Sequence, residues 1–238
     1  MRRTVVTALA GLGSVLLSVG FATPVSAAEA TCSDRPESDA VALELIGYGS
    51  TKPFGFRSDP DITVVVEAHP DTDPANVAAI SEAIEVWNAV LQDCLGGAVT
   101  ITEVDSGPGV VSRADVVLRY TPHWSGVNYS GLATCQPQRC TVWIGGEPPL
   151  GHGGGSASAL DIYNLTLHEI GHVLGLLHAT NLLESTDLMG YAWPSIGGST
   201  EIPISDCDVD ALAYVWSWAM EGTEPVPPAA PTYDCSRS

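Results

Sequence analysis

Apolar residues recur at three- and four-residue intervals in three stretches of the chain, and each stretch predicts a helix. The first follows Asp73-Pro74, a dipeptide suited to an N-cap and a first helical turn. The second runs from about residue 159 to Gly175 and has an apolar body around two histidines. The third follows Ser205, which forms a capping-box pattern with Asp208. The recurring apolar positions are Val77, Ile80, Ile84, Trp87 and Leu91 in the first helix, Leu167, Ile170, Val173 and Leu174 in the second, and Val209, Leu212, Val215 and Trp216 in the third.

Short apolar runs predict strands at residues 59–67, 99–104, 114–120 and 141–144. Strands that alternate with a helix favour a largely parallel sheet. We therefore predict a single domain of the α/β (α+β) class at residues 59–220. Residues 28–58 have no regular pattern, and the proline-rich residues 221–238 are predicted to form an extended tail fixed only at Cys235.

The N-terminus resembles an export signal. Arg2 and Arg3 precede an apolar run at residues 4–22, and Val25-Ser26-Ala27 fits a cleavage site. A transmembrane anchor is the alternative, but glycines interrupt the run and Pro24 follows it. We expect residues 1–27 to be a signal peptide and the mature chain to be secreted.

All six cysteines follow that cleavage site, and an even number in an exported chain suggests three disulfides. Six cysteines allow fifteen pairings, and the sequence does not choose among them. A local loop between Cys135 and Cys140 is the first expectation, and a link between Cys32 and Cys235 would hold both termini. Cysteine-ligated zinc is the alternative, but the paired short spacings of a zinc ribbon are missing.

The formal net charge of −19 limits the partners of the chain. An acidic surface repels nucleic acid and anionic membranes, so neither is expected as a partner. Cationic or unstructured protein substrates are tolerated better, although the charge also suits solubility outside the cell.

A histidine-rich run at residues 168–178, His-Glu-Ile-Gly-His-Val-Leu-Gly-Leu-Leu-His, indicates a metal site. His168 and His172 are four residues apart, so they lie about 40° from each other on one helical face and can chelate one ion. Glu169 lies beside this pair, a suitable place for a base that acts on metal-bound water. His178 would point away on a continuous helix, but Gly175 can end the helix in a turn that returns it to the ion. Three imidazoles leave a fourth position open, which is typical of catalytic zinc, whereas structural sites are usually closed by four protein ligands.

The run matches the H-E-x-x-H-x-x-G-x-x-H signature and thus resembles the metzincin metallopeptidases, in particular the matrixins and small secreted bacterial members. The resemblance is strong at residues 165–191 and weaker across residues 60–220. It implies a twisted, mostly parallel five-stranded sheet, an active-site helix, a methionine turn and a C-terminal helix. By the family pattern, Met189 forms the methionine turn, and Tyr191 is a candidate for stabilising the tetrahedral intermediate, with a buried structural tyrosine as the alternative.

The resemblance also suggests how partners bind. Residues 131–135 resemble the edge strand of the metzincin cleft, along which a protein or peptide substrate would bind in extended form. Residues 151–156 fall where matrixins can bind calcium or a second zinc, so Ca²⁺ is a candidate cofactor beside one catalytic Zn²⁺. A propeptide cysteine keeps matrixins inactive, but the motif around Cys32 does not match it, and a disulfide is favoured there. The protein is expected to be a monomer.

These features predict a secreted zinc endopeptidase in which His168, His172 and His178 hold the ion and Glu169 is the general base. The first alternative is a catalytically silent zinc-binding protein on the same scaffold. The second is a zinc hydrolase of another clan, in which Glu184 replaces His178 as the third ligand.

Overall fold

A computed structural model gives the fold of most of the chain. It describes residues 32–45, 57–122, 131–136, 138–146, 157–180, 187–190 and 200–237. The predicted signal peptide at residues 1–27 lies outside this part. Within the described residues, no helix has both the length and the apolar character that crossing a membrane requires.

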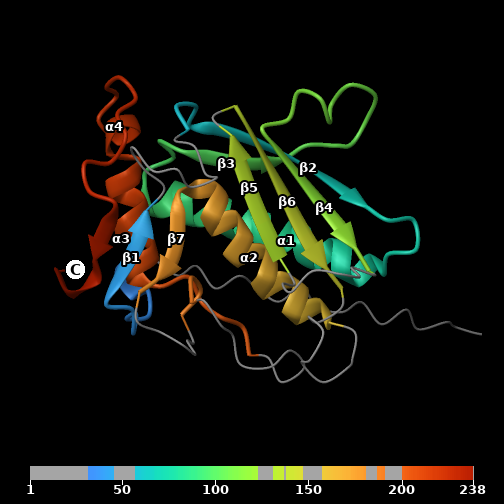
Figure 1. The fold of residues 1–238 in the computed structure, drawn as a ribbon, viewed down its shortest axis with the longest axis horizontal. Coiled ribbons are helices and arrows are strands. Elements are labelled where there is room, and N and C mark those ends of the chain that lie inside the picture. The colour runs from blue at the N-terminus through green and yellow to red at the C-terminus, as the bar shows by residue number, and fades with distance from the viewer. Residues whose placement is uncertain are drawn as a thin grey trace, which may run out of the picture.

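The larger of two sheets has five strands in the order β3-β2-β4-β6-β5. Its first four strands are parallel, and β5 pairs antiparallel with β6 at one edge. The prediction of a mostly parallel five-stranded sheet in an α+β fold is therefore confirmed (Figure 1). The strands are β2 (Asp61–Ala68), β3 (Thr100–Glu103), β4 (Val116–Thr121), β5 (Gly131–Gln136) and β6 (Arg139–Gly145).

Two long helices, α1 (Pro74–Cys94) and α2 (Ala159–Leu174), pack together on one side of this sheet (Figure 1). Asp73 caps α1 through a hydrogen bond from the backbone N–H of Ala75 at 2.9 Å. The helices are also joined by the buried Trp87, whose indole N–H donates to the Leu167 carbonyl at 2.8 Å. Periodicity thus predicted both helices, and the sheet and helices share one apolar core.

A smaller sheet joins distant parts of the chain in the order β7-β1-β8. Its strands are β7 (Leu176–Ala179), β1 (Ala42–Leu45) and β8 (Thr232–Asp234). Strand β1 lies in the segment that we expected to be irregular, and β8 lies in the tail that we expected to be fixed only at Cys235. Both expectations are wrong, because each strand is stabilised by antiparallel pairing with a distant strand.

The C-terminal part adds α3 (Asp206–Val215) and α4 (Ser217–Met220), and two 3₁₀ turns lie at Cys32–Asp34 and Cys235–Arg237. Ser205 caps α3, and its capping box with Asp208 is complete, as predicted. The indole N–H of Trp216 donates to the Leu174 carbonyl at 2.7 Å, which fixes α3 against the end of α2.

Three disulfides link the described cysteines. The predicted link between Cys135 and Cys140 is present and closes the β5–β6 hairpin. The expected pair Cys32–Cys235 is wrong: Cys32 bonds Cys94, the last residue of α1, and Cys235 bonds Cys207 in α3. The pairing of β8 with β1 places Cys235 at α3, away from the partner of Cys32.

Candidate metal centre

The candidate centre begins with two histidines on one face of α2. Ser158 starts the helix with a complete capping box to Asp161, which fixes the first turn. His168 and His172 follow four residues apart and are both buried. Their ring centroids are 4.6 Å apart, so the predicted chelating pair is present.

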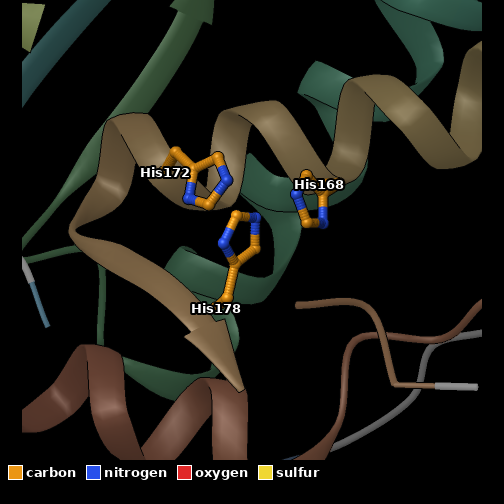
Figure 2. Close-up of side chains that lie close together, drawn as sticks. All are labelled: His168, His172 and His178. Atoms are coloured by element: carbon orange, nitrogen blue, oxygen red, sulfur yellow. The ribbon is translucent and has the colours of Figure 1, made fainter. Parts of the chain in front are cut away.

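A left-handed turn brings in the third histidine. Gly175 ends α2 with φ of 119°, a conformation that favours glycine. Strand β7 begins at the next residue and carries His178 back towards the helix (Figure 2). The possible ligand atoms of the three histidines all lie within 4.8 Å of one another. The predicted return of His178 at Gly175 is therefore what the structure shows.

Hydrogen bonds define which ring nitrogens face the centre. The Nδ1 atom of His168 lies 2.6 Å from the Leu188 carbonyl, and that of His172 lies 2.8 Å from the Leu176 carbonyl. A carbonyl only accepts, so each Nδ1 carries the proton and each neutral ring keeps the Nε2 lone pair. Such second contacts orient histidines that ligate metals.

Burial keeps both helical histidines neutral. It lowers the pKa of His168 to about 4, against a smaller opposing effect of the hydrogen bond to Leu188. Burial likewise lowers the pKa of His172 well below its ordinary value, and the neighbouring His168 and His178 add to this effect. Neutral imidazole is the form that binds metal, so the site is prepared for a cation.

The turn at residues 187–190 lies against both ligand-bearing elements. Its Leu188 carbonyl accepts from His168, and its Met189 carbonyl accepts from the backbone N–H of Ala179 in β7 at 2.8 Å. Met189 is fully buried, and a methyl group on Gly171 would lie 2.6 Å from its sulfur. Met189 therefore packs closely against α2 at Gly171, and its role as the methionine turn stays a prediction.

Glu169 is buried on the neighbouring face of α2, beside the edge strand β5. Burial raises the pKa of Glu169 to about 8, while a hydrogen bond from the backbone N–H of Ala133 acts in the opposite direction. Its Oε2 atom is buried and has no hydrogen-bond partner among the described residues. An unpaired buried carboxylate oxygen is costly unless a ligand completes its contacts.

The donor set fits one catalytic zinc ion. Three imidazole nitrogens are common zinc ligands, and a three-ligand site leaves a position for water or substrate next to Glu169. Within the described residues, these three histidines are the group that could hold a metal ion. The described residues give no support for a calcium site. Residues 151–156, Tyr191 and Glu184 lie outside the described residues.

Sequence reasoning missed several residues that shape the centre. The backbone carbonyls of Leu176 and Leu188 leave no sequence signal, because any residue offers a carbonyl. Gly171 did leave a sequence signal. A glycine in a helix interior costs about 1 kcal/mol relative to alanine, so its presence suggests that another residue packs closely against the helix there. In the structure that residue is Met189.

Comparisons with known proteins place the chain near mammalian collagenases. It is 29% identical over 173 residues to interstitial collagenase of Bos taurus, which is 68% of this chain and 33% of the relative. Interstitial collagenase of Oryctolagus cuniculus is 25% identical over 176 residues, with the same shares covered. The chain thus spans about a third of the length of these curated relatives. They are vertebrate proteins, so the expected bacterial membership stays a prediction.

Two further comparisons add little. No family model matches the chain. Among solved structures, high choriolytic enzyme 1, a hatching enzyme zinc-protease of the medaka fish Oryzias latipes, is 14% identical with a TM-score of 0.35. That match covers 74% of this chain and 98% of the solved one.

Proposed function

Since this chain is related to the interstitial collagenases and has the three-histidine site of a metzincin-type zinc metallopeptidase, we propose that it is a secreted endopeptidase that hydrolyses peptide bonds of proteins. One observation carries the proposal. The buried Glu169 has a carboxylate oxygen with no hydrogen-bond partner among the described residues, and it lies next in sequence to His168 in a cluster of three histidines. A purely structural metal site has no use for such a carboxylate.

In the proposed reaction, the Nε2 lone pairs of His168 and His172 and a ring nitrogen of His178 hold the metal. A bound zinc ion supplies a Lewis acid for the scissile carbonyl, lowers the pKa of water from about 15.7 to about 7, and favours ionised Glu169. Glu169 accepts the proton of the attacking water at its carboxylate and then donates it to the leaving amine. Burial of Glu169 favours proton transfer near neutral pH, because it raises the pKa of this carboxyl group to about 8.

The proposed substrate is an extended segment of protein chain. Strand β5 forms one edge of the five-stranded sheet and pairs with β6 on one side only. A substrate strand added at the other side of β5 would lie close to Glu169, which accepts a hydrogen bond from Ala133 of the same strand. Leu132 on β5 is 36% exposed and offers an apolar contact for such a substrate.

The proposal also covers the location of the protein, the bounds of its catalytic unit and its oligomeric state. Three disulfides suit an oxidising compartment, which supports an extracellular location after removal of residues 1–27. We also propose that residues 59–220 form the catalytic unit of a monomeric enzyme. The methionine-turn role of Met189 belongs to the same proposal.

The test is hydrolysis of unfolded casein by the purified secreted chain, beside the variant Glu169→Ala, with zinc per molecule measured in both. We expect the wild type to cleave casein and Glu169→Ala to be slower by about 10²- to 10⁴-fold with its zinc retained. Glu85→Ala, an exposed glutamate on α1, is the matched control and should keep full activity. Zinc binding by the wild type without cleavage of casein would favour the catalytically silent alternative.

A further inference from the structure

We infer that Gly131 is a positioning residue for Glu169, because the backbone of β5 approaches the glutamate so closely that only glycine fits. This inference rests on the proposed role of Glu169 as general base. It adds a residue outside the histidine motif that determines whether the base is correctly placed.

The contact geometry supports the inference directly. A Cβ atom built on Gly131 would lie 2.3 Å from Oε1 of Glu169 and 2.9 Å from its Cδ atom. It would also lie 2.8 Å from Cδ1 of Leu165, one turn earlier on α2. Nonbonded carbon atoms optimally lie about 3.5–4.0 Å apart, so any side chain at this position must displace a neighbour.

Backbone strain does not explain the glycine. Gly131 is absent from the described glycines with positive φ, which are Gly96, Gly97, Gly109, Gly175 and Gly222. Alanine can therefore adopt the backbone conformation of Gly131 without strain. What excludes a side chain there is the space that Glu169 and Leu165 occupy.

The strand is held more firmly than the glutamate. Gly131 is the first residue of a continuous antiparallel register with β6, from the pair Gly131 and Ile144 to the pair Gln136 and Arg139. The disulfide Cys135–Cys140 links the two strands at the other end of this register. Glu169 meets the added atom with the far end of a flexible side chain. The carboxylate group, rather than the strand, is therefore the part that moves.

The movement affects the base in two ways. It shifts Oε1 by several tenths of an ångström, and it disturbs the hydrogen bond that the Glu169 carboxylate accepts from Ala133. A misplacement of about 1 Å in catalytic geometry can cost about 10²-fold in rate. None of the three histidines is among the atoms nearest to the added Cβ, so metal binding should be unaffected.

The test compares Gly131→Ala with the matched control Gly107→Ala, where an added Cβ would meet only Val110 Cγ2 at an ordinary 3.6 Å. Zinc content, thermal stability, KM and kcat are measured with a fluorogenic peptide. We expect Gly131→Ala to keep its zinc and its KM while kcat falls by about 10- to 100-fold. Gly107→Ala should match the wild type. Wild-type kcat in Gly131→Ala would overturn the inference.

Two further measurements separate positioning from a general structural effect. Combined with Glu169→Ala, the substitution Gly131→Ala should cause no additional loss of residual activity, because it acts through Glu169. An equal loss in both backgrounds would contradict the inference. A crystal structure of Gly131→Ala tests it without any activity: a displaced Glu169 carboxylate with unmoved histidines is expected, and an unmoved carboxylate would overturn it. If the wild type itself fails to cleave peptides, the proposed function fails, whereas the crystal structure still decides the role of Gly131.

Discussion

The two sheets supply different parts of the same centre, and they are assembled differently along the chain. The five-stranded sheet is built from residues 61–145, and its edge strand contacts the base Glu169. The three-stranded sheet contains the ligand strand β7, but its other strands are β1 and β8 from near the two ends of the described chain. The base therefore depends on one compact segment, whereas the third metal ligand depends on both ends of the chain.

Hydrogen bonds show how the chain ends support His178. The backbone N–H of Thr180, two residues after His178, donates to the Ala42 carbonyl at 2.8 Å. The N-terminal segment also contacts the turn at residues 187–190, since the Ser38 hydroxyl donates to Asp187 at 2.5 Å. Loss of the N-terminal segment should therefore reach the metal centre through β7 and this turn, whereas loss of β8 should act through its pairing with β1.

The largest expected effect comes from removing the ligand that the three-stranded sheet supplies. Loss of a residue that only orients a metal ligand costs roughly 10- to 100-fold in zinc affinity. His178→Ala removes a ligand itself, so zinc affinity should fall by more than this, and activity should fall with it. Zinc titration of His178→Ala and Glu184→Ala provides the comparison. Zinc loss in Glu184→Ala, with zinc retained in His178→Ala, would assign the third ligand to Glu184.

The next largest effect should come from removing one of two disulfides, Cys207–Cys235 next to the three-stranded sheet or Cys135–Cys140 in the five-stranded sheet. Chain entropy predicts about 3.6 kcal/mol of stabilisation from Cys207–Cys235, which spans 28 residues, and about 2 kcal/mol from Cys135–Cys140, which spans 5. Replacing each pair with serine and measuring urea unfolding checks this order. The Cys207–Cys235 variant alone should also bind zinc more weakly, since its bond holds β8 and thereby β1. Equal zinc affinity in both variants would show that the tail does not support His178.

A smaller effect should appear in the pH dependence of stability, through Asp208 of α3. Asp208 is fully buried, and burial, with a further contribution from Asp187, raises its pKa from 3.8 to about 8. The folded pKa exceeds the unfolded one, so protonated Asp208 favours folding. That stabilisation is complete below about pH 4 and is lost as the pH rises towards about 8.

The variant Asp208→Asn, which cannot ionise, should therefore lose less stability than the wild type between about pH 5 and pH 8. We expect the Tm of the wild type to fall by at least about 2–4 °C more than that of Asp208→Asn over this range, because each pH unit between the two pKa values removes about 1.4 kcal/mol of stability. The exposed Asp39→Asn serves as the matched control. Parallel Tm curves for the wild type and Asp208→Asn would contradict the assignment.

The difference between local contacts and contacts with distant parts of the chain explains which features could be predicted from the sequence. The spacing of His168, Glu169 and His172 fixes their geometry on a helix, and Gly175 marks the turn that returns His178. Strand β1 escaped prediction because four residues carry little local signal, and its partners lie more than 130 residues away. The partner of Cys32 could not be chosen among fifteen pairings, and the role of Gly131 depends on a contact with α2 that only the fold creates.

The central claim is that the two sheets and α2 together form a three-histidine zinc site with an open fourth position beside Glu169. X-ray absorption at the zinc edge of the purified chain tests it most directly. We predict three imidazole nitrogens at about 2.0–2.1 Å and a light oxygen ligand, with the same nitrogen shell in Glu169→Ala. A sulfur ligand at about 2.3 Å, or a fourth histidine, would indicate a closed structural site and contradict the account.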